Sequence, residues 1–185
     1  RYLLDGWKEE AERKGFMLFI PHFDLKSYPL ADYQEVGVMN AAHTVANAPE
    51  KITPVLVDKL FEYVRQFTGS MRKGYMIYGH SAGGQFVQRF MLFHDSPYVE
   101  KAIISSPGWY TFTAGIPYIS SEQIKKYLSK PIILQLALGD TIRESFLRKT
   151  PEAERQGRNR MERGRSFWLY IHQLAASRGW ECHWR

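Results

Sequence analysis

The sequence predicts an α/β protein, in which a mostly parallel sheet is covered by helices on both faces. Two observations support this prediction. Short stretches that are apolar throughout recur along the chain, as they do in parallel strands buried on both sides. Between them lie segments whose apolar residues recur at helical spacing. Ligands bind at the carboxyl ends of the strands in such sheets, so functional residues are expected just after each strand.

Strands and helices are predicted to alternate along most of the chain. The predicted strands cover residues 16–21, 74–79, 101–106 and 131–138, and a fifth begins within residues 181–185. The predicted helices cover residues 2–14, 53–69, 82–93 and 121–129, and a last one begins at Ser166. Pro54 suits the first turn of the second helix, and the long stretch 22–52 is predicted to be loop.

Length and composition indicate a soluble globular protein of one domain, residues 1–185. The chain is 44% hydrophobic and 24% charged, and no apolar run approaches the roughly 18 residues of a membrane helix. Its single cysteine, Cys182, excludes an internal disulfide and does not fix the compartment, so secretion and export to the periplasm stay open. The net charge of +6 is modest and is attributed to a solvated surface.

The most informative motif is Gly79-His80-Ser81-Ala82-Gly83, at the junction between a predicted strand and a predicted helix. A serine on such a sharp turn stands out above the sheet in a strained conformation, and this is the geometry of a nucleophile elbow. Glycine at 79 and 83 would avoid collisions across the turn. The N–H of Ala82 is expected to stabilise an oxyanion. A phosphate-binding turn fits less well, because neither G-x-G-x-x-G spacing nor a P-loop lysine is present.

A nucleophilic serine needs a histidine to accept its proton and a carboxylate to orient that histidine. In proteins with a nucleophile elbow, the acid follows the serine along the chain. Asp140 is the first carboxylate after the strand 131–138 and is the predicted acid. Glu144, four residues later, is the reserve candidate.

The position of the histidine is the main difficulty. The base is expected in the loop after the last strand, and none of the six histidines lies there. They are His22, His43, His80, His94, His172 and His183. His94 ends the helix that Ser81 begins, and His172 reads as a surface or packing residue within a helix. The catalytic histidine is therefore expected beyond Arg185.

Residues 143–165 alternate arginine with glutamate. A nucleic-acid-binding face is one interpretation, but no aromatic platform accompanies the arginines, so a solvated helical surface is favoured. No cluster of histidine, cysteine, aspartate or glutamate has metal-ligand spacing, and no cofactor is expected.

Three stretches resemble a known group of proteins. "GHSAGGQFVQRF", "SSPGWYTF" and "LRKTPEAERQGRNRMERGRSFW" are similar to the poly(3-hydroxybutyrate) depolymerase and feruloyl-esterase-like branch of the α/β-hydrolases. The resemblance covers most of the chain. It implies an α/β-hydrolase fold with Ser81 as nucleophile and Asp140 as acid. It also implies that substrate-binding residues include His80, Phe23, Trp109 and Tyr110, the last two lining the acyl pocket, and that His22 and Tyr28 face the site.

The chain departs from the pattern of this group in two places. The group carries a His-Gly loop, which supplies a second oxyanion N–H, just before the helix that opens this sequence. The final histidine is the other missing part, so the chain is expected to be incomplete at both ends.

The expected function is hydrolysis of carboxylic esters, small or polymeric, through an acyl-enzyme on Ser81. A peptidase or acyltransferase of the same fold, and a non-catalytic binding protein, remain alternatives. The ester and the oligomeric state stay open.

Overall fold

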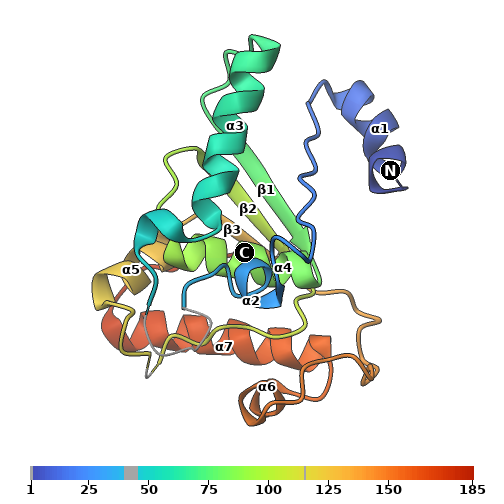
Figure 1. Ribbon diagram of the computed structural model, residues 1–185. Coiled ribbons are helices and arrows are strands. Elements are labelled where there is room, and N and C mark those ends of the chain that lie inside the picture. Colours follow the sequence, from blue (N-terminus) through green and yellow to red (C-terminus); the bar gives the residue numbers. More distant parts are fainter. Residues whose placement is uncertain (1, 40–45, 115) are drawn as a thin grey trace.

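The computed structural model describes residues 2–39, 46–114 and 116–185 (Figure 1). Its sheet contains the strands β1 (Tyr75–His80), β2 (Val99–Ser105) and β3 (Ile132–Gln135), in that spatial order. Both strand pairs are parallel, as the sequence predicts.

The helices of the described residues surround this sheet. They are α1 (Tyr2–Lys14), α2 (Leu30–Tyr33), the 3-10 helix η1 (Pro49–Lys51), α3 (Pro54–Thr68), α4 (Ala82–Phe93), α5 (Ser121–Ser129), α6 (Pro151–Gln156) and α7 (Arg160–Arg178). Two short helices thus interrupt the stretch 22–52 that was predicted to be loop. None of the helices in the described part of the chain is both long and apolar enough to cross a membrane.

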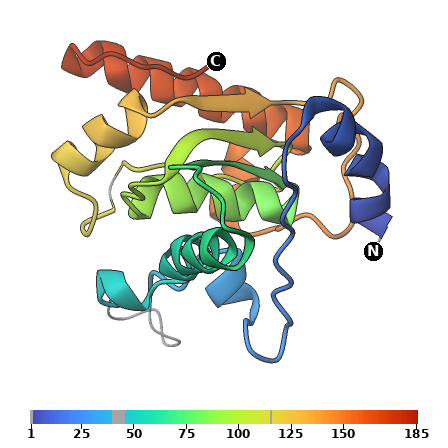
Figure 2. The same cartoon turned by 90° about the horizontal axis from the view of Figure 1, so that it is seen from above.

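The helix α4 connects β1 to β2 and packs along both strands (Figures 1 and 2). Phe90 of α4, Ile104 of β2 and Phe167 of α7 are fully buried in one common core. The opposite face of β1 is less covered. Met76 is 63% exposed there and Tyr78 49% exposed. The ring of Trp7 in α1 lies 6.1 Å from the Tyr78 ring and contributes partial cover.

The predicted strand 16–21 is wrong. These residues form an extended trace that links α1 to the loop before α2, and no described strand pairs with it (Figures 1 and 2). Phe16, Met17 and Phe19 are all exposed. An apolar run becomes a strand only when a neighbouring strand satisfies its backbone groups. The predicted strand 131–138 is also too long, because its last three residues belong to the loop after β3.

The predicted fifth strand is present only as a single residue pairing. The N–H of Arg185 donates to the Ile132 carbonyl at 3.0 Å, and the Leu134 N–H donates to the Arg185 carbonyl at 2.8 Å. These two hydrogen bonds have the pattern of parallel strand pairing, but residues 181–185 do not form a strand. Trp184, within this segment, is buried in the core.

The last helix, α7, begins at Arg160, six residues before the predicted start. The Asn159 side chain accepts a hydrogen bond from the Glu162 N–H at 2.9 Å, and the Glu162 carboxylate accepts from the Arg158 N–H at 2.7 Å. These reciprocal bonds resemble a capping box. The spacing Asn-x-x-Glu is visible in the sequence and could have placed the helix start.

Close backbone contacts fix α4 against the sheet at its first turn. A Cβ added at Gly79 would overlap the carbonyl of Gly83, and one added at Gly84 would lie 2.8 Å from the Ser105 carbonyl oxygen. Gly83 itself has room for a side chain, since the nearest atom, the Tyr33 hydroxyl oxygen, would be 3.5 Å away. The glycines that the packing requires are therefore 79 and 84, and the expectation for Gly83 was wrong.

We expect Gly79→Ala to destabilise the fold by about 3 kcal/mol or more, because the new methyl group has no space between two backbone segments. Gly139→Ala is the matched control, since a Cβ there meets nothing within 4 Å. Its free energy of unfolding should change by about 0.5 kcal/mol or less. Urea denaturation followed by circular dichroism measures both. Equal stability of the two variants would show that the close contact between β1 and α4 is not required.

Candidate functional site

Ser81 stands between the last residue of β1 and the first residue of α4, with backbone angles φ 56° and ψ −114°. A positive φ is uncommon for residues other than glycine and marks a strained turn. The turn is held by the Ser81 N–H, which donates to the Ser105 carbonyl at 3.0 Å, and by the Ser81 carbonyl, which accepts from the Gln85 N–H at 3.1 Å. The strained turn that the sequence predicts at this serine is thus confirmed.

Ala82 is the first residue of α4 and is half-buried. The first N–H groups of a helix have no acceptor within the helix, and they carry the positive end of its dipole. The N–H of Ala82 therefore has the properties that an oxyanion donor needs. That role remains a prediction.

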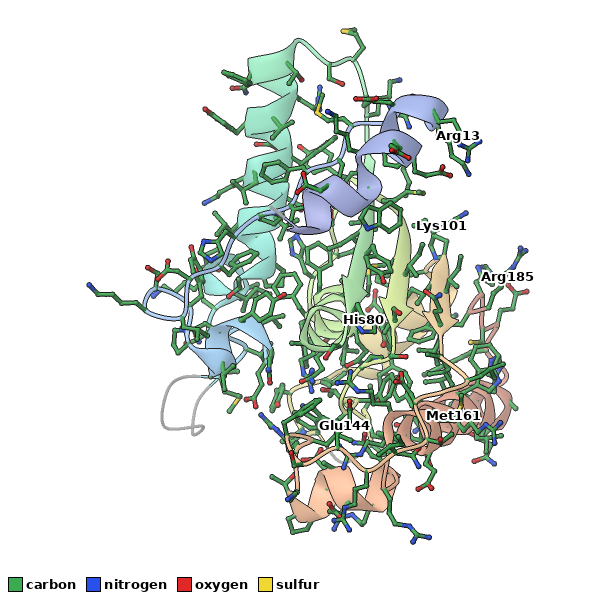
Figure 3. The ribbon with its side chains drawn as sticks, turned by 90° about the vertical axis from the view of Figure 1, so that its right-hand side faces the viewer. Arg13, His80, Lys101, Glu144, Met161 and Arg185 are labelled. Atoms are coloured by element: carbon green, nitrogen blue, oxygen red, sulfur yellow. The ribbon has the colours of Figure 1, made fainter. Side chains whose placement is uncertain are left out.

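The loops after the three strands gather at one end of the sheet. Figure 3 shows Lys101 near the start of β2 and His80 at the end of β1, with Glu144 and Met161 beyond His80 in the direction of the strands. In Figure 1, α6 and α7 lie below these carboxyl ends. The sequence-predicted serine, acid and pocket residues therefore belong to neighbouring loops, as the parallel topology requires.

Asp140 lies in the loop after β3, and its backbone is fixed on both sides. Its N–H donates to the Ala137 carbonyl at 3.1 Å, and its own carbonyl accepts from the Met161 N–H at 3.1 Å. Its carboxylate oxygen Oδ2 is buried and has no hydrogen-bond partner among the described residues. A buried carboxylate oxygen without a donor is costly, so this atom is suited to receive one.

Glu144, the reserve acid, is already engaged. Its Oε2 accepts from Nε of Arg160 at 2.7 Å in an ion pair. The buried guanidinium of Arg160 thus holds the carboxylate that would otherwise compete with Asp140. This difference between the two carboxylates was not visible in the sequence.

The described histidines lie in five separate environments, and none of them hydrogen-bonds to Asp140. His22 is exposed, and His80 Nδ1 lies 3.2 Å from Ser105 Oγ. His94 pairs with Asp58 at 2.7 Å, and His183 contacts Glu181 at 3.2 Å. The His172 ring packs against the Trp168 ring at an interplanar angle of 56°, with ring centroids 4.2 Å apart. His43 lies outside the described residues. His172 was expected to be a surface or packing residue, and its contact with Trp168 is of the packing kind.

The two predicted pocket residues after β2 are both buried. The guanidinium carbons of Arg89 and Arg148 both lie over the Trp109 ring, each 4.3 Å from its centre. Arg148 is paired with Glu35 at 2.8 Å. Burial lowers the pKa of Arg89 to about 10. Trp109 therefore holds two cationic side chains in place, which its position in the sequence did not indicate.

Tyr110 is fully buried, and its ring stacks on Phe167 at 4.5 Å. Burial raises the pKa of its hydroxyl; the charge of Arg160 lowers it, and the weaker effect of Asp140 raises it. The hydroxyl has no hydrogen-bond partner in the described part of the chain. Tyr110 is thus a core residue whose polar end lies near the predicted acid.

Phe23 belongs to an aromatic cluster beside the Ser81 turn. Its ring centre lies 5.4 Å from that of Tyr33, 5.7 Å from that of Phe86 and 5.1 Å from that of Tyr28. Burial raises the pKa of Tyr33, whose hydroxyl lies near Gly83. The loop before α2 therefore places aromatic side chains against the first turns of α4.

The interpretation of residues 143–165 as a solvated surface is wrong for two arginines. Arg160 is 7% exposed and Arg163 is 1% exposed. The Arg163 guanidinium donates to the carbonyls of Gly157, Gly108 and Arg148 at 2.9, 2.6 and 2.9 Å. Alternating arginine and glutamate do not reveal which side chains turn inward.

Within the described residues, no cluster of three or more histidine, cysteine, aspartate or glutamate side chains is arranged to hold a metal ion.

Two solved structures closely resemble this one. A poly(aspartic acid) hydrolase-1 from Sphingomonas sp. KT-1 is 30% identical with a TM-score of 0.90, and the match covers 98% of this chain and 72% of that one. LpqC, a poly(3-hydroxybutyrate) depolymerase from Bordetella parapertussis, is 26% identical with a TM-score of 0.89; the match covers 98% of this chain. The chain spans 64% of the length of this depolymerase.

No protein-family model and no curated protein matches the chain. The two structural matches assign the chain to a family, and the parallel sheet and the strained serine turn between β1 and α4 agree with that assignment. The chain belongs to the α/β-hydrolase superfamily, in its depolymerase-like branch.

Proposed function

We propose that this protein is a serine hydrolase that forms an acyl-enzyme on Ser81. The conformation of Ser81 carries the proposal, because a positive φ at the head of α4 presents the serine beside unpaired helix N–H groups. Oγ of Ser81 attacks the substrate carbonyl and forms the new C–O bond. The N–H of Ala82 stabilises the oxyanion, and expulsion of the leaving group gives the acyl-enzyme, which water then hydrolyses.

The proton of Ser81 must pass to a base and then to the leaving group. We propose that the base is a histidine whose ring N–H donates to Oδ2 of Asp140. The buried, unpartnered state of this oxygen supports the assignment.

The proposed substrates are carboxylic esters, and the depolymerase neighbour supports an ester, including a polymeric one. Hydrolysis of amides is the second candidate, because the other neighbour is a poly(aspartic acid) hydrolase and amide bonds join such chains. Both reactions would use the same acyl-enzyme, so the leaving group distinguishes them.

We expect Ser81→Ala to lower the turnover of p-nitrophenyl butyrate by ~10⁶, because no other group replaces the attacking oxygen. Ser145→Ala is the matched control, since Ser145 is an exposed serine in the loop after β3. It should retain wild-type turnover. Steady-state kinetics measures both variants. Retention of turnover by Ser81→Ala would remove the basis of the proposed function.

Asp140→Asn should lower turnover by ~10⁴, because an amide would leave the histidine in the wrong tautomer. Glu144→Gln keeps an acceptor for Arg160 and should cost about tenfold or less, the effect of a weakened charge-assisted hydrogen bond. The same ester assay compares the two variants. The reverse order of effects would make Glu144 the acid.

We expect the enzyme to hydrolyse p-nitrophenyl butyrate faster than the matching p-nitroanilide, because an ester oxygen leaves more readily than an amide nitrogen and the proposed substrate is an ester. The ratio of the two kcat/KM values measures the preference. Comparable rates on the two substrates, both lost in Ser81→Ala, would favour amide hydrolysis as the function.

A further inference from the structure

Arg160 contacts both of the loops that carry predicted site residues. Its Nη1 donates to the Ser106 carbonyl at 2.8 Å, in the loop after β2, and its Nε donates to Glu144 at 2.7 Å, in the loop after β3. Its guanidinium carbon also lies 5.7 Å from the ring centre of Phe146, further along the second loop. One buried side chain thus joins the segment that leads to Tyr110 to the segment that contains Asp140.

The residues on either side of Arg160 hold the same loop. The Met161 N–H donates to the Asp140 carbonyl at 3.1 Å, and the Asn159 amide donates to the Thr141 carbonyl at 3.0 Å. Figure 3 shows Glu144 and Met161 both beyond His80, past the carboxyl ends of the strands. The N-cap Asn159 and the first two residues of α7 therefore bond to the loop after β3 at three consecutive positions. The Arg160 guanidinium adds the link to the loop after β2.

We propose that Arg160 is a positioning residue for the reaction: its guanidinium sets the distance between the loops after β2 and β3, and thereby the place of the Asp140 carboxylate relative to Ser81. The inference rests on the proposed function. Ser81 is tied to the loop after β2 through its N–H bond to the Ser105 carbonyl. Asp140 is in the loop after β3, so the Arg160 bridge directly controls their separation.

Arginine has a specific advantage in this role. Its planar guanidinium presents donors in a fixed fork, so two acceptors on different loops are held at a defined spacing. A lysine at the same place would supply a single ammonium group, which can approach one acceptor closely but does not hold both. The order of the kcat values with arginine, lysine and an apolar residue at position 160 therefore tests the bridge.

The test is steady-state kinetics on p-nitrophenyl butyrate, with kcat calculated per site that reacts with a fluorophosphonate. This normalisation removes loss of folded protein from the result. We expect Arg160→Met to lower kcat by about 10- to 100-fold with KM within about twofold, because small displacements of a catalytic group cost rates of this size. Arg160→Lys should give an intermediate kcat at the same KM.

Two further variants complete the experiment. Arg143→Met removes an arginine of the same loop whose contact, with Glu154 at 3.0 Å, is on the surface, and its kcat should stay at the wild-type value. Glu144→Gln weakens the bridge from its exposed side, so the experiment does not depend on the folding of the buried variants. It should lower kcat with KM unchanged, by less than Arg160→Met does.

Wild-type kcat per reactive site in Arg160→Met or in Glu144→Gln would overturn the inference, as would a loss of the same size in Arg143→Met. A rise in KM at constant kcat would also overturn it, because it would make Arg160 a substrate-binding residue. If turnover does not depend on Ser81, the proposed function and this inference both fail. Ser81-dependent turnover without dependence on Arg160 rejects this inference alone.

Discussion

The close approach of α4 to β1 is the constraint on which the site depends. Without side chains at Gly79 and Gly84, the first turn of the helix comes against the end of one strand and against the Ser105 carbonyl of the next. Ser81 makes this junction with a positive φ of 56°. The same contact directs the amino end of α4 toward the carboxyl edge of the sheet, where the loops after β2 and β3 also lie. Strain at one residue is thus offset by the packing of the whole helix.

Buried arginines give the loops around this junction their shape. Few of the residues between 106 and 114 or between 136 and 150 form regular structure, so their carbonyls need donors from elsewhere. Arg160 and Arg163 supply such donors from α7, to the carbonyls of Ser106, Gly108 and Arg148. Arg89 of α4 donates elsewhere, to the carbonyl of Gln34 at the end of α2 and to that of Gln85 in its own helix. A buried guanidinium is costly unless its N–H groups are satisfied, so each such side chain also restricts where a loop can move.

Much of the fold could be predicted from the sequence because its signals are local. Helical spacing and the glycine at 69 located α3 closely, and the G-x-S-x-G motif located the strained turn. The prediction of a strand at 16–21 failed because a strand depends on a partner that composition does not reveal. The prediction of a solvated surface failed at the two buried arginines for a related reason, since burial at 160 and 163 is decided by loops far away in the sequence. Asp140 and Glu144 could be nominated as candidates. Only the structure shows that Oδ2 of Asp140 has no donor among the described residues, whereas Glu144 is bound to arginine.

Formation of a covalent bond on Ser81 is the central claim, and trapping that bond tests it most directly. The enzyme is treated with a fluorophosphonate, digested, and its peptides are mapped by mass spectrometry. The account predicts one stoichiometric adduct, located on Ser81, which does not form when the protein is denatured before treatment. An adduct on a different residue, or turnover that continues in protein fully labelled at Ser81, would contradict it.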